Sequence, residues 1–547
     1  MRIALAQFNS IIGDFENTTS KIIQRVHDAE SQGADLIVFP ELAVCGYPPE
    51  DYLEYPDFIH KCKQSAETIA LECKNITAII GLPTVNPNAE GKNLYNSAAI
   101  LRAGKISGYI HKSLLPTYDI FDEYRYFEPN RTFNCIEING IKIALTICED
   151  LWNAEDDPMY VSSPMDQLIK ENPSLMINIA ASPFDYIHAE ERKAILKRNA
   201  DKYQLPLIYV NHAGAQTELI FDGGSLAMNK NGELISELTY FKEENLIIEF
   251  QQGDLHAPKS IFQKPTDRIA LIHDALVLGI KDYFSKQGFK KAILGLSGGI
   301  DSAVVICLAA EALGAENVKA LLMPSSFSSK GSIDDSLQLA SILGVQQETI
   351  AIQPLYESFL SSLFPTFKGM PFNLTEENLQ ARIRGTLLMA QSNKLGAILL
   401  NTSNKSELAV GYGTLYGDMC GGLSVIGDVY KTDVYRLASW INREKDIIPN
   451  AIITKAPSAE LRPDQKDADS LPEYEQLDPL LYQFIEKRKS IAELIDAGFD
   501  ATMVKRIVKL VNANEFKRHQ APPILRISPK AFGSGRRIPI VAGYLSK

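Results

Sequence analysis

The chain has 547 residues, a formal net charge of −12, 45% hydrophobic residues and 22% charged residues. Its length exceeds what one hydrophobic core can organise and predicts two large domains, while its near-average composition argues against a disordered or fibrous protein. The negative charge disfavours a nucleic acid or an anionic membrane as partner.

The first ten residues, MRIALAQFNS, reach Gln7 and Asn9 before an apolar signal-peptide core forms, so they predict no export. No stretch approaches the roughly 18 apolar residues of a membrane helix. The seven cysteines are scattered without CxxC spacing, which indicates free thiols in a reducing cytoplasm.

Short β-branched runs recur in the first half of the chain and predict buried strands. These runs cover residues 2–8, 34–40, 76–82, 141–148, 175–180, 205–212 and 245–250. The run at 18–33 predicts a helix between two of the strands, so we expect a layered α/β domain over residues 1–252. The following segment, QGDLHAPKSIFQKPTD, mixes Gly, Pro and polar residues and predicts a linker over 253–266.

Helices and strands alternate more regularly over residues 267–547. We expect helices at 268–287, 300–314, 332–344 and 375–396, and strands at 290–297, 318–325, 347–353 and 397–404. This rhythm predicts an open, doubly wound parallel sheet, whose ligands bind at the carboxyl ends of the strands.

The string LGLSGGIDS, residues 294–302, joins a predicted strand to a predicted helix. Its glycines allow a tight turn, and the free N–H groups at the start of the helix point toward an anion. Asp301 stands where a Walker loop has its Lys, so it suits Mg2+ beside a phosphate, although it could also be a simple helix cap.

This loop resembles the pyrophosphate loop of the N-type ATP pyrophosphatases, which implies a Rossmann-like domain of the adenine nucleotide alpha hydrolase type. By that resemblance the loop holds the β and γ phosphates of ATP as a leaving group while a substrate oxygen is adenylated. The implied ATP-binding residues are Gly295, Leu296, Ser297, Gly298, Gly299, Ile300, Asp301 and Ser302.

Cys148 ends a predicted buried strand in IALTICED, and a thiol there needs a neighbouring base or cation to act as a nucleophile. Glu41 in FPEL and Lys112 in HKSLLP are candidates at two other expected strand ends. Together the three segments resemble the Glu-Lys-Cys segments of the nitrilase superfamily, whose amidases have an αββα sandwich. The resemblance implies Glu41 as general base, Lys112 as oxyanion stabiliser, Cys148 as nucleophile and Glu123 as a supporting glutamate.

The segment NIAASPFDYIHAEERK resembles the glutamine-binding segment of such amidases. It implies that Ser182 contacts the α-substituents of glutamine, with Tyr118 at the mouth of the site. The family often has Lys or Arg six residues after this serine, where this chain has His188.

The segments LNTSNKSELAVGYGTLYGD and GDVYKTDVYRLA resemble NAD synthetases of the glutamine-dependent type, so the resemblance covers essentially the whole chain. It implies ATP contacts at Thr402 and Lys431, and Mg2+ shared by Asp301 and Glu407. Further expected contacts to deamido-NAD come from Asn378, Arg382, Glu407, Asp418 and Lys517. Lys431 and Lys517 are alternatively surface charges, while Arg536 and Arg537 are either a phosphate contact or a basic tail.

The implied reaction is the ATP-dependent amidation of deamido-NAD to NAD, with ammonia from glutamine and release of AMP, pyrophosphate and glutamate. Its substrates would be glutamine, ATP and deamido-NAD, its cofactor Mg2+, and we expect a homo-oligomer without nucleic-acid or membrane partners. Three alternatives stay open: another glutamine-dependent adenylating ligase, a nitrilase-type amidase with a regulatory nucleotide-binding domain, and a binding protein without turnover.

Overall fold

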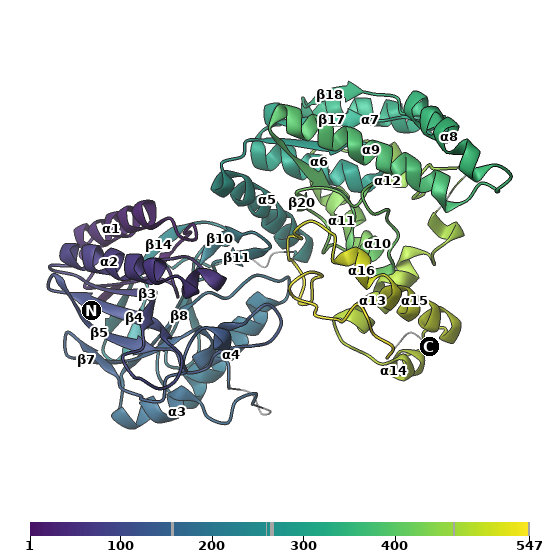
Figure 1. The fold of residues 1–547 in the computed structure, drawn as a ribbon. Helices are drawn as coiled ribbons and strands as arrows, with labels where there is room; N and C mark the ends of the chain where they lie inside the picture. The colour runs from purple at the N-terminus through teal and green to yellow at the C-terminus, as the bar shows by residue number, and fades with distance from the viewer. Residues whose placement is uncertain (155–157, 259, 263–266, 463–464, 466, 545–547) are drawn as a thin grey trace. The chain divides into compact units, whose positions relative to one another are not determined.

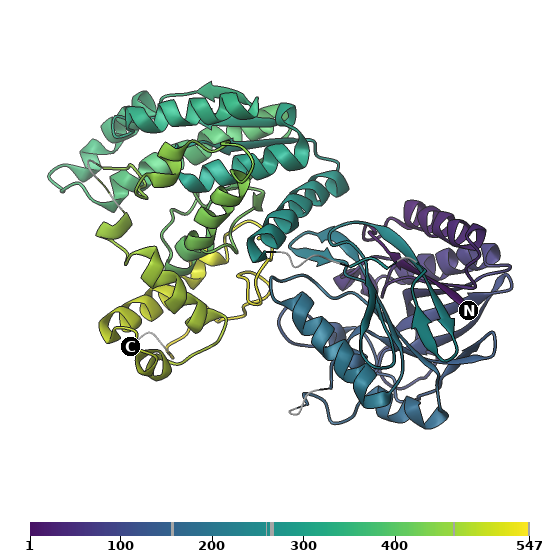
Figure 2. The same ribbon diagram turned by 180° about the vertical axis from the view of Figure 1, so that it is seen from behind.

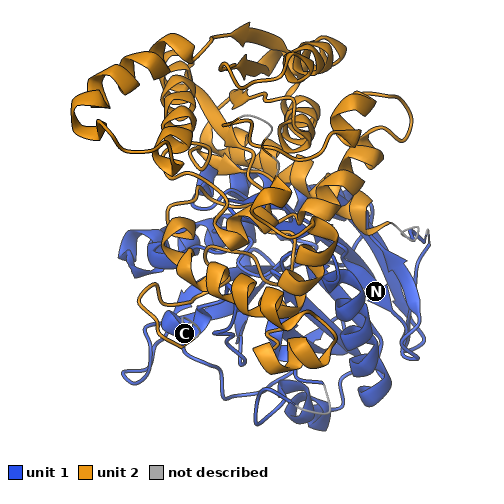
Figure 3. Ribbon diagram, turned by 90° about the vertical axis from the view of Figure 1, so that its right-hand side faces the viewer, with its two compact units in different colours: residues 1–266 blue, residues 267–547 orange. Residues whose placement is uncertain are grey.

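The computed structural model describes residues 1–154, 158–258, 260–262, 267–462, 465 and 467–544. The chain divides into two compact units, Met1–Thr266 and Asp267–Lys547, shown in two colours in Figure 3. Of the segment expected as a linker, residues 259 and 263–266 lie outside the described residues.

The structure differs from the linker prediction at strand β15 (Asp254–His256), which pairs antiparallel with β14 (Glu244–Gln251). Gln252 and Gly253 have φ values of 53° and 78° between these strands, as a two-residue hairpin turn requires. Leu255 of β15 is 1% exposed and belongs to the core of the first unit. The tight turn and the buried Leu255 of β15 therefore extend the sheet into a segment whose composition predicted only a linker.

The first unit contains two large sheets. The seven-stranded sheet has the order β15-β14-β1-β2-β3-β4-β5, and the six-stranded sheet has the order β13-β12-β9-β8-β7-β6. The remaining bounds are β1 (Arg2–Gln7), β2 (Leu36–Val38), β3 (Thr77–Val85), β4 (Leu94–Arg102), β5 (Lys105–His111), β6 (Ile136–Ile138), β7 (Ile141–Ile147), β8 (Leu175–Ala180), β9 (Leu207–Asn211), β12 (Leu226–Met228) and β13 (Leu234–Glu237). A separate hairpin pairs β10 (Ala213–Gln216) with β11 (Leu219–Asp222).

Alternation along β1 explains how the layers stack, because successive side chains of a strand point to opposite faces. Ile3 and Leu5 join a core cluster with residues of β7, β8 and β9, so they lie between the two sheets. Ala4 and Ala6 instead contact a cluster that contains residues of α1 (Phe15–Ser31) and α2 (Pro56–Glu72).

Two further helices, α3 (Pro164–Leu168) and α4 (His188–Tyr203), accompany the six-stranded sheet on the side away from α1 and α2 (Figure 1, Figure 2). Met165 and Leu168 of α3 and Leu196 of α4 belong to the same core as strands β7 to β9. The four layers are those of a nitrilase-like αββα sandwich, as the sequence predicted.

The second unit is built on a five-stranded sheet of order β18-β17-β16-β19-β20, in which every pairing is parallel. Its strands are β16 (Lys291–Gly295), β17 (Val318–Leu322), β18 (Gln346–Thr349), β19 (Ala397–Asn401) and β20 (Leu423–Ser424). The chain runs from β16 outward to β18 and then returns to the other side of β16 with β19. The predicted doubly wound parallel sheet is confirmed, with its switch point between β16 and β19.

The helices of the second unit include the predicted α5 (Arg268–Gln287), α6 (Ile300–Leu313), α7 (Lys330–Leu343) and α9 (Leu374–Leu395). Not predicted were α8 (Gln353–Phe367), α10 (Lys405–Val410), α11 (Lys431–Ile441), α12 (Asn450–Thr454), α13 (Tyr474–Ile485), α14 (Ile491–Asp496), α15 (Ala501–Ala513) and α16 (Glu515–Arg518). Residues of α13, α14 and α15 form one apolar cluster with residues of α10, so the C-terminal helices pack against α10. Within the described parts of the chain, no helix has the length and apolarity that a membrane crossing requires.

Candidate active sites

A buried group of charged side chains lies at the strand ends of the first unit. Lys112 Nζ donates hydrogen bonds to Glu41 Oε1 at 2.7 Å and to Glu123 Oε1 at 2.8 Å, and the side chains of Lys112 and Glu41 have no exposed surface. Burial alone lowers the pKa of Lys112, but the carboxylates of Glu123 and Glu41 raise it well above its ordinary value. Lys112 is therefore a fixed positive charge in this group.

The two carboxylates have further neutral donors. The Asn96 amide donates to both of them, Tyr47 donates its hydroxyl to Glu123 Oε1 at 2.9 Å, and the backbone N–H of Ala181 donates to Glu41 Oε2 at 2.9 Å. Burial raises the pKa of Glu123 to about 7, against the opposing effect of Lys112. When Glu41 and Glu123 are both ionised, their negative charge exceeds the single positive charge of Lys112.

Cys148 follows the last residue of β7 and begins the 3-10 helix η3 (Cys148–Leu151). Its φ of 44° lies in the left-handed region, which is strained for a residue with a side chain and is common at functional sites. The thiol is buried, and burial together with the Glu41 carboxylate raises its pKa well above the ordinary value. The resting thiol is therefore protonated, and it needs a base during nucleophilic attack.

Glu149, next to Cys148, is a further buried carboxylate in this region. Its oxygens accept hydrogen bonds from the hydroxyls of Tyr118 and Tyr160, each at 3.1 Å. Burial raises the pKa of Glu149 despite these donors and the charge of Lys112. A cationic group that arrives here would gain a buried carboxylate partner.

Ser182 lies just beyond β8, on the segment expected to bind glutamine. Its Oγ is 2.7 Å from Nε2 of His188, and the ring of His188 stacks on Trp152 at a centroid distance of 4.9 Å. The Asn211 side chain holds the Ser182 backbone, since it accepts from Ser182 N at 2.9 Å and donates to Ser182 O at 3.0 Å. The structure thus brings Ser182 and His188 together.

In the second unit, the loop between β16 and α6 lies at the switch point of the sheet. Gly298 has a φ of 79°, and a Cβ there would come 2.4 Å from the carbonyl oxygen of Ser332. Ser302 Oγ donates to Gly299 O at 3.0 Å and accepts from Ser297 N at 3.3 Å, which closes the loop on itself. The first N–H groups of α6 are left at a concave turn, which is the arrangement that binds phosphate.

Asp301 and Glu407 meet around one ammonium group. Lys431 Nζ contacts Asp301 Oδ2 and lies 3.4 Å from Glu407 Oε1, and the Lys431 side chain is buried. Asn404, the residue that caps α10, donates from its side-chain amide to Asp301 Oδ1 at 3.0 Å. Burial raises the pKa of Glu407 to about 8, partly offset by Lys431. Lys431 is thus no surface charge, because it balances two buried carboxylates.

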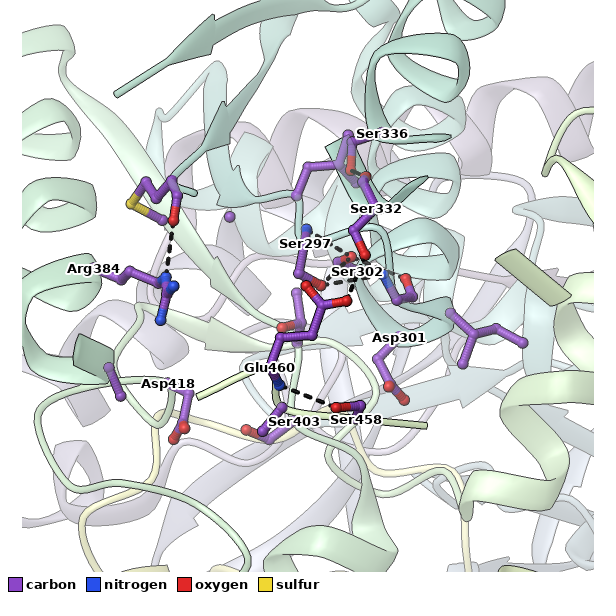
Figure 4. Close-up of a pocket in the computed structure, with 18 of the residues that line it drawn as sticks. Ser297, Asp301, Ser302, Ser332, Ser336, Arg384, Ser403, Asp418, Ser458 and Glu460 are labelled. Atoms are coloured by element: carbon purple, nitrogen blue, oxygen red, sulfur yellow. Dashed lines mark hydrogen bonds between the residues drawn. The ribbon is translucent and has the colours of Figure 1, made fainter. Parts of the chain in front are cut away.

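A cavity of about 300 Å³ opens beside this group (Figure 4). Eleven of the residues expected at the nucleotide site line it: Gly295, Leu296, Ser297, Gly299, Ile300, Asp301, Ser302, Thr402, Glu407, Asp418 and Lys431. Gly298 does not line the cavity; its φ fits its place against Ser332, where the turn needs a glycine.

Four residues expected to meet the second substrate gather around the loop of residues 411–418: Asp418 lies on it, and Asn378, Arg382 and Lys517 contact it from α9 and α16. Thr414 Oγ1 donates to Asn378 at 2.8 Å, Arg382 Nε donates to Leu415 O at 3.2 Å, and Lys517 Nζ donates to Gly411 O and Gly413 O at 2.8 Å. Asp418 Oδ1 accepts from Thr414 N at 2.6 Å, and burial raises its pKa to about 6. Asn378, Arg382 and Lys517 do not line the cavity, although they hold the loop that carries Asp418.

The sequence motifs do not identify several residues of the site. In the second unit these are Asn404, Arg384, Ser332, Lys455 and Glu460, and Figure 4 shows the carboxylate of Glu460 directed toward Ser332. Glu460 Oε1 accepts from Ser332 Oγ at 2.7 Å and from Lys455 Nζ at 2.8 Å. Arg536 contacts Glu515, so its charge is paired within the chain and carries no sign of a phosphate site.

Comparison with known proteins places both halves in established families. A carbon-nitrogen hydrolase model matches residues 2–259, and an NAD synthase model matches residues 272–521. A glutamine-dependent NAD(+) synthetase of Synechocystis is 46% identical over 99% of both chains, and one of Acinetobacter baylyi is 43% identical over 99% of this chain and 98% of its own. The solved structure of the glutamine-dependent NAD+ synthetase of Acinetobacter baumannii, in complex with ADP, is similar with 40% identity and a TM-score of 0.78 over 99% of both chains. The chain therefore belongs to the family of glutamine-dependent NAD(+) synthetases.

Proposed function

We propose that this chain converts deamido-NAD to NAD, using ATP and the amide nitrogen of glutamine and releasing AMP, pyrophosphate and glutamate. The observation that carries the proposal is the presence of two complementary sites in one chain. One is a buried thiol with a base and a cation, and the other is a phosphate-type loop beside paired carboxylates. Relatives that share 99% of the chain at 40% identity or more bear the name of this activity.

At the first site, Glu41 takes the proton of the Cys148 thiol as the sulfur attacks the side-chain amide carbon of glutamine. The Lys112 ammonium stabilises the oxyanion of the tetrahedral intermediate, because it is fixed and positively charged in a dry setting. Collapse of this intermediate expels ammonia, which receives the proton from Glu41, and leaves a thioester on Cys148. Water, deprotonated by Glu41, then attacks the thioester carbon, the C–S bond breaks to release glutamate, and Glu41 returns the proton to the Cys148 sulfur.

Recognition of glutamine follows from the charges around the thiol. The α-ammonium group would pair with Glu149, whose carboxylate Tyr118 and Tyr160 orient. The α-carboxylate would accept hydrogen bonds from Ser182 Oγ and from His188. This assignment gives His188 the role that a Lys or Arg often has in related amidases.

At the second site, the nicotinate carboxylate of deamido-NAD attacks the α-phosphorus of ATP, and the bond to pyrophosphate breaks. The backbone amides of the loop from Ser297 to Ser302 and the ammonium of Lys431 would hold the departing pyrophosphate. Ammonia then attacks the activated carbonyl, AMP leaves, and the carboxamide of NAD is formed.

Asp301 and Glu407 fit a magnesium ion, since both offer carboxylate oxygens and both lie against the same ammonium group. Mg2+ is usually held by one or two carboxylates plus substrate phosphates, which matches a site that ATP completes. When bound, the ion would supply charge neutralisation at the phosphates. Thr402 lines the same cavity and would contact ATP.

Deamido-NAD would bind beside the loop of residues 411–418. Asn378, Arg382 and Lys517 hold this loop by hydrogen bonds, and Asp418 and Glu407 line the adjoining cavity. Arg382 and Lys517 bring positive charge to a substrate that carries phosphates and a carboxylate.

We also propose that the chain forms a homo-oligomer. Six large apolar side chains of α8, of the segment between α8 and α9 and of the start of α9 are exposed: Leu355, Phe359, Phe364, Met370, Phe372 and Leu374. Such a patch is typical of a protein interface, and sedimentation analysis would determine the state. A reducing cytoplasm suits the seven cysteines, all of which are free.

The activity is tested by incubating the protein with ATP, Mg2+, deamido-NAD and glutamine and measuring NAD and AMP. Equal amounts of NAD and AMP are expected, and Cys148→Ala should abolish the reaction with glutamine while leaving it intact with added ammonium. Formation of ADP in place of AMP would contradict the proposed adenylation.

A further inference from the structure

Asn96 lies within β4 and contacts three parts of the amidase site. Its Nδ2 donates to Glu41 Oε1 at 2.7 Å and to Glu123 Oε2 at 3.3 Å, and its backbone oxygen accepts from Lys112 N at 2.8 Å. The residue is 1% exposed. None of the roles assigned above uses this side chain.

The amide of Asn96 is suited to this place because it brings two N–H donors without a charge. Glu41 and Glu123 share a single cation, Lys112, so their mutual repulsion in a buried site is only partly balanced. Hydrogen bonds to ionised acceptors are strong ones, and each of the two amide hydrogens serves a different carboxylate. Asn96 therefore links the two carboxylates by hydrogen bonds of its own, in addition to those that Lys112 donates.

The same contacts distinguish the two oxygens of Glu41. Oε1 accepts from both Lys112 Nζ and Asn96 Nδ2, whereas Oε2 accepts from Ala181 N. Ala181 directly follows β8, and β8 pairs in parallel with β7, with Ile179 opposite Ile147. Cys148 is the next residue after Ile147, so Oε2 is held toward the strand ends where the thiol lies.

We propose that Asn96 is a positioning residue of the amidase site, which holds Glu41 and Glu123 about Lys112 and leaves Oε2 of Glu41 to receive the thiol proton. This inference rests on the proposed function and names the atom that performs its first proton transfer. Asn96 acts through Glu41 and Glu123 and does not touch the reacting atoms.

The pH dependence follows from Glu123, whose pKa burial raises to about 7 and to which Asn96 donates, in the setting of the groups around the two carboxylates. These are Lys112 after β5, Glu123 in η2 (Glu123–Arg125), Tyr47 on the loop after Glu41, Cys148 and Glu149 in η3, and His212, whose Nε2 lies 2.7 Å from Glu41 O. Removing donors from a carboxylate disfavours its charged form and raises its pKa. Loss of the Asn96 amide should therefore move the acid limb of the glutamine reaction to higher pH.

The test compares Asn96→Leu and Asn96→Asp, which approximate the shape of Asn, with Ser97→Ala. Ser97 is buried on the same strand and points to the opposite face, where its Oγ contacts Thr84 and His111. Rates with glutamine and with ammonium are measured for each protein from pH 5.5 to about 9. The ammonium rate and the thermal midpoint report on folding, and Asn96→Asp carries the test if Asn96→Leu does not fold.

We expect Asn96→Leu to lower kcat with glutamine roughly 10- to 100-fold, as loss of hydrogen bonds to a charged group implies. Its acid limb should rise by about one pH unit, and Asn96→Asp, which adds a third carboxylate, should raise it further. Ser97→Ala should keep the wild-type profile. An unchanged acid limb in a folded Asn96 variant would overturn the inference, whereas wild-type protein without glutamine-dependent NAD synthesis would instead overturn the proposed function.

Discussion

Asn404 donates a hydrogen bond from its side-chain amide to Asp301 Oδ1 at 3.0 Å, and thereby joins two motifs 103 residues apart. The same side chain caps α10, because its Oδ1 accepts from Glu407 N at 3.0 Å. One residue therefore sets the start of the helix that carries Glu407 and orients the carboxylate of Asp301. The meeting of these motifs follows from the sheet, since β16 and β19 are neighbouring parallel strands whose carboxyl ends lie side by side.

Replacing Asn404 by Ser separates the two roles of this residue. Ser keeps an N-cap acceptor for the backbone of α10, but it is too short to reach Asp301 and lacks the amide group that donates to it. We expect the KM for magnesium-bound ATP to rise about 10-fold with glutamine and with ammonium, as loss of one hydrogen bond to a charged group implies. The unfolding free energy should change by less than about 1 kcal/mol. An unchanged KM in both reactions would show that the contact with Asp301 does not orient the site.

Gly298→Ala tests the turn of the phosphate loop. The added Cβ would meet the backbone of Ser332 at 2.4 Å, at a φ that disfavours side chains. We expect a loss of roughly 1–3 kcal/mol in unfolding free energy and a weakened affinity for ATP. Gly344→Ala is the matched control, because Gly344 has a φ of 70° with no atom within 4 Å of its Cβ position. Chemical unfolding should show the larger loss for Gly298→Ala, and equal losses would mean that only the φ value matters.

If His188 binds glutamine, its replacement should change the KM for glutamine more than it changes kcat. His188→Ala removes a partner of Ser182 and should raise the KM for glutamine about 10-fold with a smaller change in kcat. His188→Lys supplies a fixed positive charge and should recover much of the affinity if the residue faces the α-carboxylate of glutamine. Steady-state kinetics with glutamine and with butyramide, which lacks both the α-amino and the α-carboxylate group, tests this role. Equal effects on the two substrates would exclude recognition of the α-carboxylate.

The pH profile reports on the carboxylates around Lys112. Burial raises the pKa of Glu123 to about 7, so the group gains a proton as the pH falls through this value and Lys112 loses a charged partner. Glutamine-driven NAD synthesis should therefore decline as the pH falls below about 7, the pKa of Glu123. The ammonium-driven rate, compared at constant free ammonia, should lack this limb. Glu123→Gln should lose the limb at reduced kcat, and persistence of an identical limb would assign it to another group.

The structure shows why some of the site could be predicted and some could not. Cys148 and the loop at Ser297 lie at strand ends within long motifs, and a buried strand followed by polar residues is readable from the sequence. Asn96 lies inside β4 and reaches Glu41, 55 residues away in the chain and just after β2, so only the pairing of β2 with β3 and of β3 with β4 reveals its contact. Its neighbours in LYNSAAIL give a strand pattern in which one Asn has no distinguishing mark.

The second unit illustrates the same limit. Its parallel sheet follows from the alternation of helices and strands, whereas the packing of the C-terminal helices against α10 joins segments far apart in the chain and is seen only in the structure. The hairpin at Gln252 and Gly253 was hidden in a segment with the composition of a linker. The composition of that segment predicted a surface linker and did not reveal that the side chain of Leu255 is buried.

Glutamine labelled with ¹⁵N in its amide group tests the central claim most directly. With ATP, Mg2+ and deamido-NAD present, mass spectrometry should find one ¹⁵N in the carboxamide of NAD and one AMP for each NAD formed, and Cys148→Ala should form labelled NAD at no measurable rate. Unlabelled NAD, or labelled NAD produced equally by Cys148→Ala, would contradict the account in which the buried thiol supplies the nitrogen that completes the adenylation chemistry of the second site.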